Sequence, residues 1–96
     1  MEVSFAGTVI EWRGPAPYHF VRLPEDVADV LADVAKAVTY GWGMVPVDLT
    51  IGDTTSYTAL WPKDGSYLLP LKDALRRAEG IELSDEIEVH LSVRGL

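Results

Sequence analysis

Residues 86–93 alternate strictly between polar and apolar side chains, and this pattern constrains the fold more than any other in the chain. The apolar residues of the segment, from Ile87 to Val93, all fall on one side of the alternation. Successive side chains of a β-strand point to opposite faces of a sheet, so the segment predicts a strand with one buried and one solvated face. The same alternation recurs over residues 45–51. We therefore expect a protein built mainly of half-buried strands.

Two segments near the N-terminus, residues 3–13 and 18–23, are rich in β-branched and aromatic side chains and flank Gly14-Pro15-Ala16-Pro17. Proline fixes φ and has no amide hydrogen, so this cluster interrupts strand pairing. Strand, short connection and strand together predict a hairpin. Gly7 is a candidate bend or bulge within the first strand.

A second hairpin is predicted in the middle of the chain. Residues 45–51 are followed by a Gly52-Asp53 turn and by residues 54–61, which are rich in threonine and aromatic side chains. Pro62-Lys63-Asp64-Gly65 then forms a turn cluster, and residues 66–69 form a short strand.

The first helix is predicted from Pro24 to about Val38. Proline suits the first helical position, and Glu25 and Asp26 favour the positive end of the helix dipole. Gly41 is the expected end of this helix. Several apolar residues recur at helical spacing and are expected to face inward: Val27, Val30, Leu31, Val34, Ala35 and Val38.

A second, shorter helix is predicted to begin at Pro70 and to end at Gly80 in the left-handed conformation. Arg76 and Arg77 lie near its negative end, and Ile81 is placed to pack back on Leu75. The expected inward-facing residues are Leu71, Ala74, Leu75 and Ala78.

These elements predict a mostly β (α+β) fold, a small closed or partly closed β-barrel of about six strands with two short helices. Closure would remove the exposed sheet edges. With 96 residues, of which 48% are hydrophobic, the chain suits a single globular domain over residues 1–96.

The formal net charge of -7 and the absence of cysteine limit the partners and the compartment. Lysine and arginine drive nucleic-acid binding by displacing phosphate counterions, so we expect no nucleic-acid partner. No apolar run reaches the length of a membrane span, so no membrane partner is expected either. A chain without cysteine has no disulfide framework, and we expect a cytoplasmic protein.

Three stretches resemble an uncharacterised bacterial family, domain of unknown function nineteen-oh-five. They are Phe5-Ala6-Gly7-Thr8-Val9, residues 18–24, and residues 67–71 followed by 74–81. The resemblance spans nearly the whole chain and implies a bacterial protein with a small closed barrel, but no activity. Where that family has Gly-Asp before its last strand, this chain has Ser84-Asp85, so a residue other than glycine must make the turn.

The order of strand, Leu-Pro, short helix, Gly-Ile and strand also looks like one half of the swapped-hairpin barrels of antitoxins and transition-state regulators. That resemblance implies a dimer that binds DNA. The acidic charge of this chain argues against carrying the activity over.

The candidate ligand-binding residues are Trp12, Tyr18, His19 and Arg76. They belong to a wider group with Trp42, Tyr57 and Trp61, since aromatic side chains with one polar tip often line pockets and interfaces. Trp12, Tyr18 and His19 flank one predicted connection, so a hairpin would bring them together. The alternative is that these aromatic residues are ordinary parts of the core.

Three functional hypotheses follow. The favoured one is a non-enzymatic domain that binds an unknown small molecule or protein. The second is a small enzyme in which His19 is the general base and Arg76 holds an anionic substrate, which requires both on one concave surface. The third is the DNA-binding regulator. No catalytic residue is assigned, and no metal or cofactor is expected, because His19 and His90 lie far apart and Gly41-Trp42-Gly43 lacks the remainder of a phosphate-binding loop.

Overall fold

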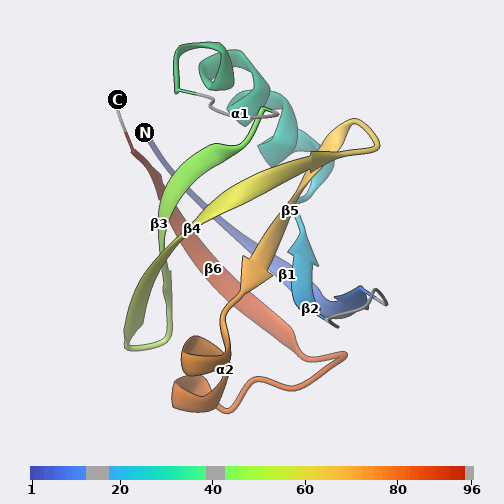
Figure 1. The fold of residues 1–96 in the computed structure, drawn as a ribbon, viewed down its shortest axis with the longest axis vertical. Coiled ribbons are helices and arrows are strands. Elements are labelled where there is room, and N and C mark those ends of the chain that lie inside the picture. The colour runs from blue at the N-terminus through green and yellow to red at the C-terminus, as the bar shows by residue number, and fades with distance from the viewer. Residues whose placement is uncertain (13–17, 39–42, 95–96) are drawn as a thin grey trace.

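The computed structural model describes residues 1–12, 18–38 and 43–94, which form six strands and two helices (Figure 1). The predicted Gly14–Pro17 connection, Arg13, Trp42 and the helix end at Gly41 lie outside these residues. In chain order the elements are β1 (Glu2–Trp12), β2 (Tyr18–Arg22), α1 (Glu25–Val38), β3 (Val45–Ile51), β4 (Thr54–Lys63), β5 (Ser66–Leu71), α2 (Asp73–Glu79) and β6 (Glu86–Val93).

The strands close into a barrel in the order β1-β2-β5-β4-β3-β6, and every neighbouring pair is antiparallel. Both predicted hairpins are confirmed, since β1 pairs with β2 and β3 pairs with β4. The first and last strands complete the ring, from Glu2 opposite Ser92 to Thr8 opposite Glu86. The predicted barrel of about six strands with two helices is therefore correct.

The two helices lie at opposite ends of the barrel (Figure 1). At one end, α1 contacts β3 and β5. At the other end, α2 contacts β4, where Thr54 Oγ1 donates a hydrogen bond of 2.5 Å to Glu79 Oε2. The barrel interior between them is filled by the apolar side chains of the alternating strands, including Val47, Leu49 and Leu91.

The buried face of α1 differs in part from the predicted one. Ala28, Leu31 and Ala35 are buried, and Val27 and Val34 are half-buried beside them, but Val30 is 49% exposed. The prediction for Val30 was wrong because only a narrow stripe of the α1 surface contacts the barrel. Ala28 and Leu31 lie on that stripe, and Val30 is turned about 100° around the helix axis from Leu31.

The start of the second helix was also predicted wrongly. Pro70 lies within β5, opposite Phe20 of β2, and α2 begins only at Asp73. Within this short helix Leu75 is buried and packs in the same core as Ile81, as expected, whereas Ala74 and Ala78 are exposed. A helix of two turns that covers only the edge of a barrel end buries one residue rather than a stripe.

The turn predicted at Pro62–Gly65 is shorter than expected. Pro62 and Lys63 belong to β4, and the turn consists of Asp64 and Gly65, which have φ values of 51° and 78°. Positive φ at two central residues is the geometry that matches the twist of a two-residue hairpin.

Gly7 is not the site of a bulge. The β1–β6 register runs without interruption through Gly7, which lies opposite Ile87. A Cβ atom at this position would lie closer than 3.0 Å to Val21 Cγ1. Glycine is needed here because the side chain of Val21 on the neighbouring strand fills the space that a Cβ would occupy.

A second apolar cluster lies on the outer surface of β2, β4 and β5. Phe20 faces away from the interior, because its neighbour Val21 belongs to the barrel core, yet Phe20 is only 1% exposed. Leu68 and Ala59 are also buried without belonging to that core. This side of the barrel is apolar on both faces.

Candidate functional site

The first three predicted site residues are brought together at one strand pair. The Cα of Trp12 lies opposite that of Tyr18, and Glu11 lies opposite His19. This confirms that the hairpin places the two strand ends side by side. The side chains of Trp12 and Tyr18 lie outside the described part of the molecule, so their role in binding stays a prediction.

His19 and Arg76 lie towards the same end of the barrel. His19 pairs with Leu71 at the end of β5, and Arg76 lies on α2, which begins two residues later. Among the side chains that the structure describes, His19 Nδ1 and Arg76 Nε are buried without a hydrogen-bond partner, which is costly for a polar atom. The guanidinium of Arg76 is paired with Asp73.

No described hydrogen bond joins His19 to Arg76, and neither side chain lines the hollows described below. The enzyme hypothesis requires both groups on one concave surface. The enzyme hypothesis therefore stays a prediction, and no described hollow is lined by both His19 and Arg76.

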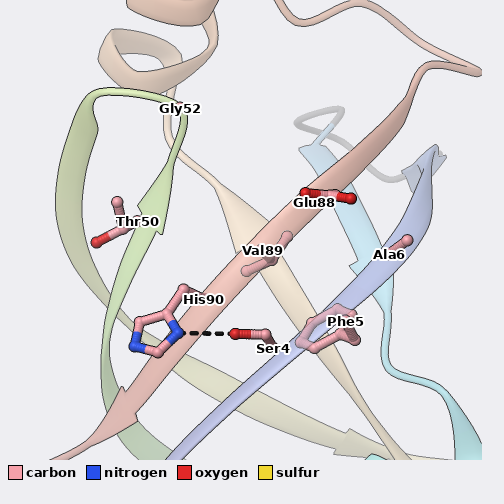
Figure 2. A pocket seen from close by; sticks show the side chains of 8 residues that line it. All are labelled: Ser4, Phe5, Ala6, Thr50, Gly52, Glu88, Val89 and His90. Atoms are coloured by element: carbon pink, nitrogen blue, oxygen red, sulfur yellow. Dashed lines mark hydrogen bonds between the residues drawn. The ribbon is translucent and has the colours of Figure 1, made fainter.

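The first hollow, here called the Ser4 groove, lies on the outside of β1, β6 and β3 (Figure 2). Its volume is about 530 Å³. Ser4 Oγ and His90 Nδ1 are 2.8 Å apart, and His90 Nε2 lies 2.7 Å from Glu2 Oε1. The residues that line the groove are Ser4, Phe5, Ala6, Thr50, Gly52, Glu88, Val89 and His90.

The sequence analysis missed this chain of hydrogen bonds. Ser4 and His90 are 86 residues apart and become direct cross-strand partners only in the β1–β6 register. Each lies on the polar side of an alternating strand, which was the available signal. The signal could not show which polar residues face each other, because that depends on strand order.

Serine, histidine and carboxylate in this order are the elements of an activated nucleophile. Acyl transfer also needs donors aimed at a developing oxyanion, and the charged group that shares the groove with Ser4 is the carboxylate of Glu88, which would repel one. The His90 side chain is 45% exposed, so water competes for its hydrogen bonds. The arrangement has the properties of a solvated cross-strand network, worth about 0.2–1 kcal/mol per pair.

A second site arises where β4 and β5 separate. Their pairing runs from Lys63 opposite Ser66 to Trp61 opposite Leu68 and ends there. The Tyr67 carbonyl accepts a hydrogen bond of 3.0 Å from the Leu23 amide on the β2 side, so by alternation the backbone groups of Leu68 and Pro70 face β4. Proline has no hydrogen to donate, and the ladder therefore loses its next bond at Pro70.

Where the strands separate, a hollow of about 430 Å³ lies beside Trp61, and Trp61 also lines a smaller hollow of about 230 Å³. We call the two together the Trp61 site. The larger hollow is lined by Met44, Thr58, Ala59, Trp61, Pro70, Leu71, Lys72 and Asp73. The smaller one is lined by Phe20, Trp61, Pro62, Lys63 and Leu68.

Trp61 is the residue that the linings of the two hollows share, and its ring packs on Phe20. Its centroid lies 5.3 Å from that of Phe20, with the planes tilted by 58°, a favourable aromatic geometry. Phe20 is fully buried, whereas Trp61 is 38% exposed. The site therefore contains an aromatic side chain that is partly exposed and packs on a buried ring.

Within residues 1–12, 18–38 and 43–94, no group of three or more histidine, cysteine, aspartate or glutamate side chains is arranged to hold a metal ion. Neither described helix is long and apolar enough to cross a lipid bilayer.

Comparison with known proteins places the fold in a family. A search of the curated proteins finds no match. The family model described as Domain of unknown function (DUF1905) matches residues 5–91, from the first half of β1 into β6. The match includes every stretch on which the sequence resemblance was based. Because it covers most of the chain and the barrel has the expected form, this protein belongs to the DUF1905 family.

Proposed function

We propose that this protein is a non-enzymatic binding domain and that its ligand is a small molecule held at the Trp61 site. The observation that carries the proposal is the separation of β4 from β5 at Pro70, which leaves a hollow of about 430 Å³ beside a partly exposed tryptophan. Ligand sites are typically concave, mostly apolar and roughly 300–1,000 Å³ in volume.

The rigidity of the site supports the proposal. Trp61 rests on the buried ring of Phe20, and the strand carrying Phe20 is paired on both sides, with β1 and with β5. A wall that is already ordered loses little conformational freedom when a ligand binds. The Ser4 groove is larger, but its His90 side chain is 45% exposed and already hydrogen-bonded to Ser4 and Glu2.

The setting proposed for this function is a bacterial cytoplasm. The family resemblance and the lack of cysteine support it. The proposal also excludes duplex DNA as the partner, because a net charge of -7 opposes the phosphate backbone. A fluorescence-anisotropy titration with random-sequence duplex at physiological salt should show no binding, and salt-sensitive binding near a micromolar would favour the regulator hypothesis.

The binding proposal can be tested with two matched substitutions. Ala59→Leu adds the same side chain to the Trp61 site that Ala6→Leu adds to the Ser4 groove, since each alanine lines one hollow. A library of small metabolites is screened by tryptophan fluorescence and by the indole N–H signals in the NMR spectrum. A Trp61→Phe variant assigns the Trp61 signal.

We expect a hit to shift the Trp61 signal, to lose its affinity in Ala59→Leu and to keep it in Ala6→Leu. Thermal unfolding of each variant checks that it remains folded. Loss of affinity in Ala6→Leu alone would place the site in the Ser4 groove. A library with no compound that shifts Trp61 would contradict the proposal.

A further inference from the structure

Lysine is unevenly distributed over this acidic barrel. The chain has three lysines, Lys36, Lys63 and Lys72. Lys63 lines the smaller hollow of the Trp61 site, and Lys72 lines the larger one. In a protein of net charge -7, two of the three lysines thus line hollows that Trp61 also lines. This placement favours a ligand of negative charge.

The acidic groups near the larger hollow are already paired with arginine. Asp48 accepts hydrogen bonds from Arg94 at 2.8–3.1 Å, and Asp73, which lines the hollow, is paired with Arg76. Each of these two pairs has a net charge near zero. Lys72 forms no ion pair with any described residue. Its positive charge at the edge of the larger hollow is therefore not neutralised by a carboxylate.

Lys72 is held in place by an aromatic ring instead of by a carboxylate. Its Nζ lies 3.9 Å from the centroid of Tyr57, and Arg94 Cζ lies 5.0 Å from the same centroid. A cation over the face of an aromatic ring is attracted without being neutralised. Tyr57 therefore keeps the ammonium at the edge of the hollow with its positive charge available.

The remainder of the hollow suits a flat apolar group. Trp61 lines it with an aromatic side chain, and Met44, Pro70 and Leu71 supply apolar walls. Aromatic rings stack well in offset or tilted arrangements, and a carboxylate forms a strong charge-assisted hydrogen bond with an ammonium. We infer that the ligand of the Trp61 site is a small aromatic carboxylate, with its ring against Trp61 and its charge on Lys72, an inference that rests on the proposed function.

The experiment compares three probes with one ring system and different charge: 2-naphthoate, 2-naphthamide and 2-naphthylmethylammonium. Binding is measured by calorimetry at low salt and by the shift of the Trp61 indole signal. We expect naphthoate to bind about fivefold more tightly than the amide, as for one partly exposed ion pair, and the ammonium compound to bind most weakly.

Two lysine variants complete the test. Lys72→Met keeps the apolar stem and removes the charge, and it leaves the start of α2 unaffected because the Lys72 side chain forms no capping hydrogen bond. Lys36→Met on α1, which removes the same charge at the other end of the barrel, is the matched control. Naphthoate and naphthamide should bind equally to the Lys72 variant and keep their difference in the Lys36 variant.

The outcomes separate the inference from the proposed function. Equal binding of all three probes at Trp61, or an unchanged preference in Lys72→Met, would overturn the inference and leave the binding proposal intact. Naphthoate that causes no shift of Trp61 would also overturn the inference, whereas the metabolite screen decides the binding proposal independently.

Discussion

Gly7 and Val21 lie so close on neighbouring strands that a Cβ on residue 7 would approach Val21 Cγ1 to less than 3.0 Å. The contact explains why β1 carries a glycine in the middle of an uninterrupted ladder. The Val21 side chain fills the space that a side chain on residue 7 would need. Any larger residue must displace Val21, which is fully buried.

Gly7→Ala should therefore destabilise the protein by about 1–3 kcal/mol, the usual effect of overpacking a core. The double variant Gly7→Ala/Val21→Ala should lose less stability than the sum of the two single changes. Val21→Ala removes the methyl group that clashes with the new Cβ at residue 7, and the added methyl group at residue 7 partly fills the cavity that Val21→Ala leaves. Urea unfolding measures both effects. Ala6→Ser, an exposed neighbour on β1, should change stability by less than about 0.5 kcal/mol. Additive effects of the two core changes would contradict the proposed contact.

Ser84 has a φ of 70° in the turn before β6, where its amide donates a hydrogen bond of 2.9 Å to the Val9 carbonyl. The left-handed conformation raises the free energy of a residue with a Cβ by about 1–2 kcal/mol. Glycine lacks this strain, but it loses more conformational entropy on folding. Ser84→Gly should give a net stabilisation of about 0.5–1 kcal/mol. Ser92→Gly, at a position of β6 that is paired with both neighbouring strands, should have the opposite sign. If Ser84→Gly lowered the urea midpoint, the strain assigned to this turn would be wrong.

Leu31 and Val30 are neighbours on α1 with opposite environments. Leu31 is fully buried against the barrel, and Val30 is about half exposed. Leu31→Ala should cost about 2–5 kcal/mol through lost burial and the resulting cavity. Val30→Ala should stay within about 0.5 kcal/mol, since alanine is also the better helix former. Equal losses in thermal melts of the two variants would contradict the orientation of the helix.

The pair of Asp48 and Arg94 predicts a specific dependence on pH. The hydrogen bonds from Arg94, assisted by its charge, hold the pKa of Asp48 below its ordinary value of 3.8. A carboxyl whose pKa is lowered by folding stabilises the folded state above the ordinary value, and this stabilisation is lost as the pH falls through the lowered pKa. Arg94→Gln should thus be less stable than the original protein at neutral pH, with the difference disappearing in acid.

Carbon-13 NMR of the Asp48 carboxyl measures the effect directly. Its midpoint should lie below the ordinary value in the original protein and should rise in Arg94→Gln. Because the pair is exposed, 1 M salt should reduce the difference. A double-mutant cycle with Asp48→Asn isolates the interaction, and an Asp48 midpoint that does not respond to Arg94→Gln would show that another group lowers it.

The strands could be predicted because each carries its own signal. The alternation over residues 45–51 and 86–93 predicted β3 and β6 with their correct buried faces, and the Gly52-Asp53 turn placed the hairpin between β3 and β4. The helices were predicted less completely. Their periodicity indicated where they lie, but Val30 was assigned to the wrong side, since the buried stripe of a helix depends on the surface that it contacts.

The candidate site could be predicted only in part. Trp61 was among the aromatic residues singled out from the sequence, but the hollow beside it exists because Pro70 faces β4 from within a strand. Taken alone, a proline shortly before a helical segment favours the first helical turn. The prediction that Pro70 begins a helix was therefore wrong for a reason that only the pairing of β5 with β2 reveals.

The sequence by itself determined the period-two and helical segments, the turn at Gly52-Asp53 and the acidic net charge, because each of these properties resides in contiguous residues or in composition. The tertiary structure alone decided that Ser4 contacts His90, that the Val21 side chain requires a glycine at residue 7 and that two lysines line the hollows beside Trp61. These relationships depend on strand order and register. Strand order and register are selected by how all the apolar faces can be buried together, so no segment encodes them separately.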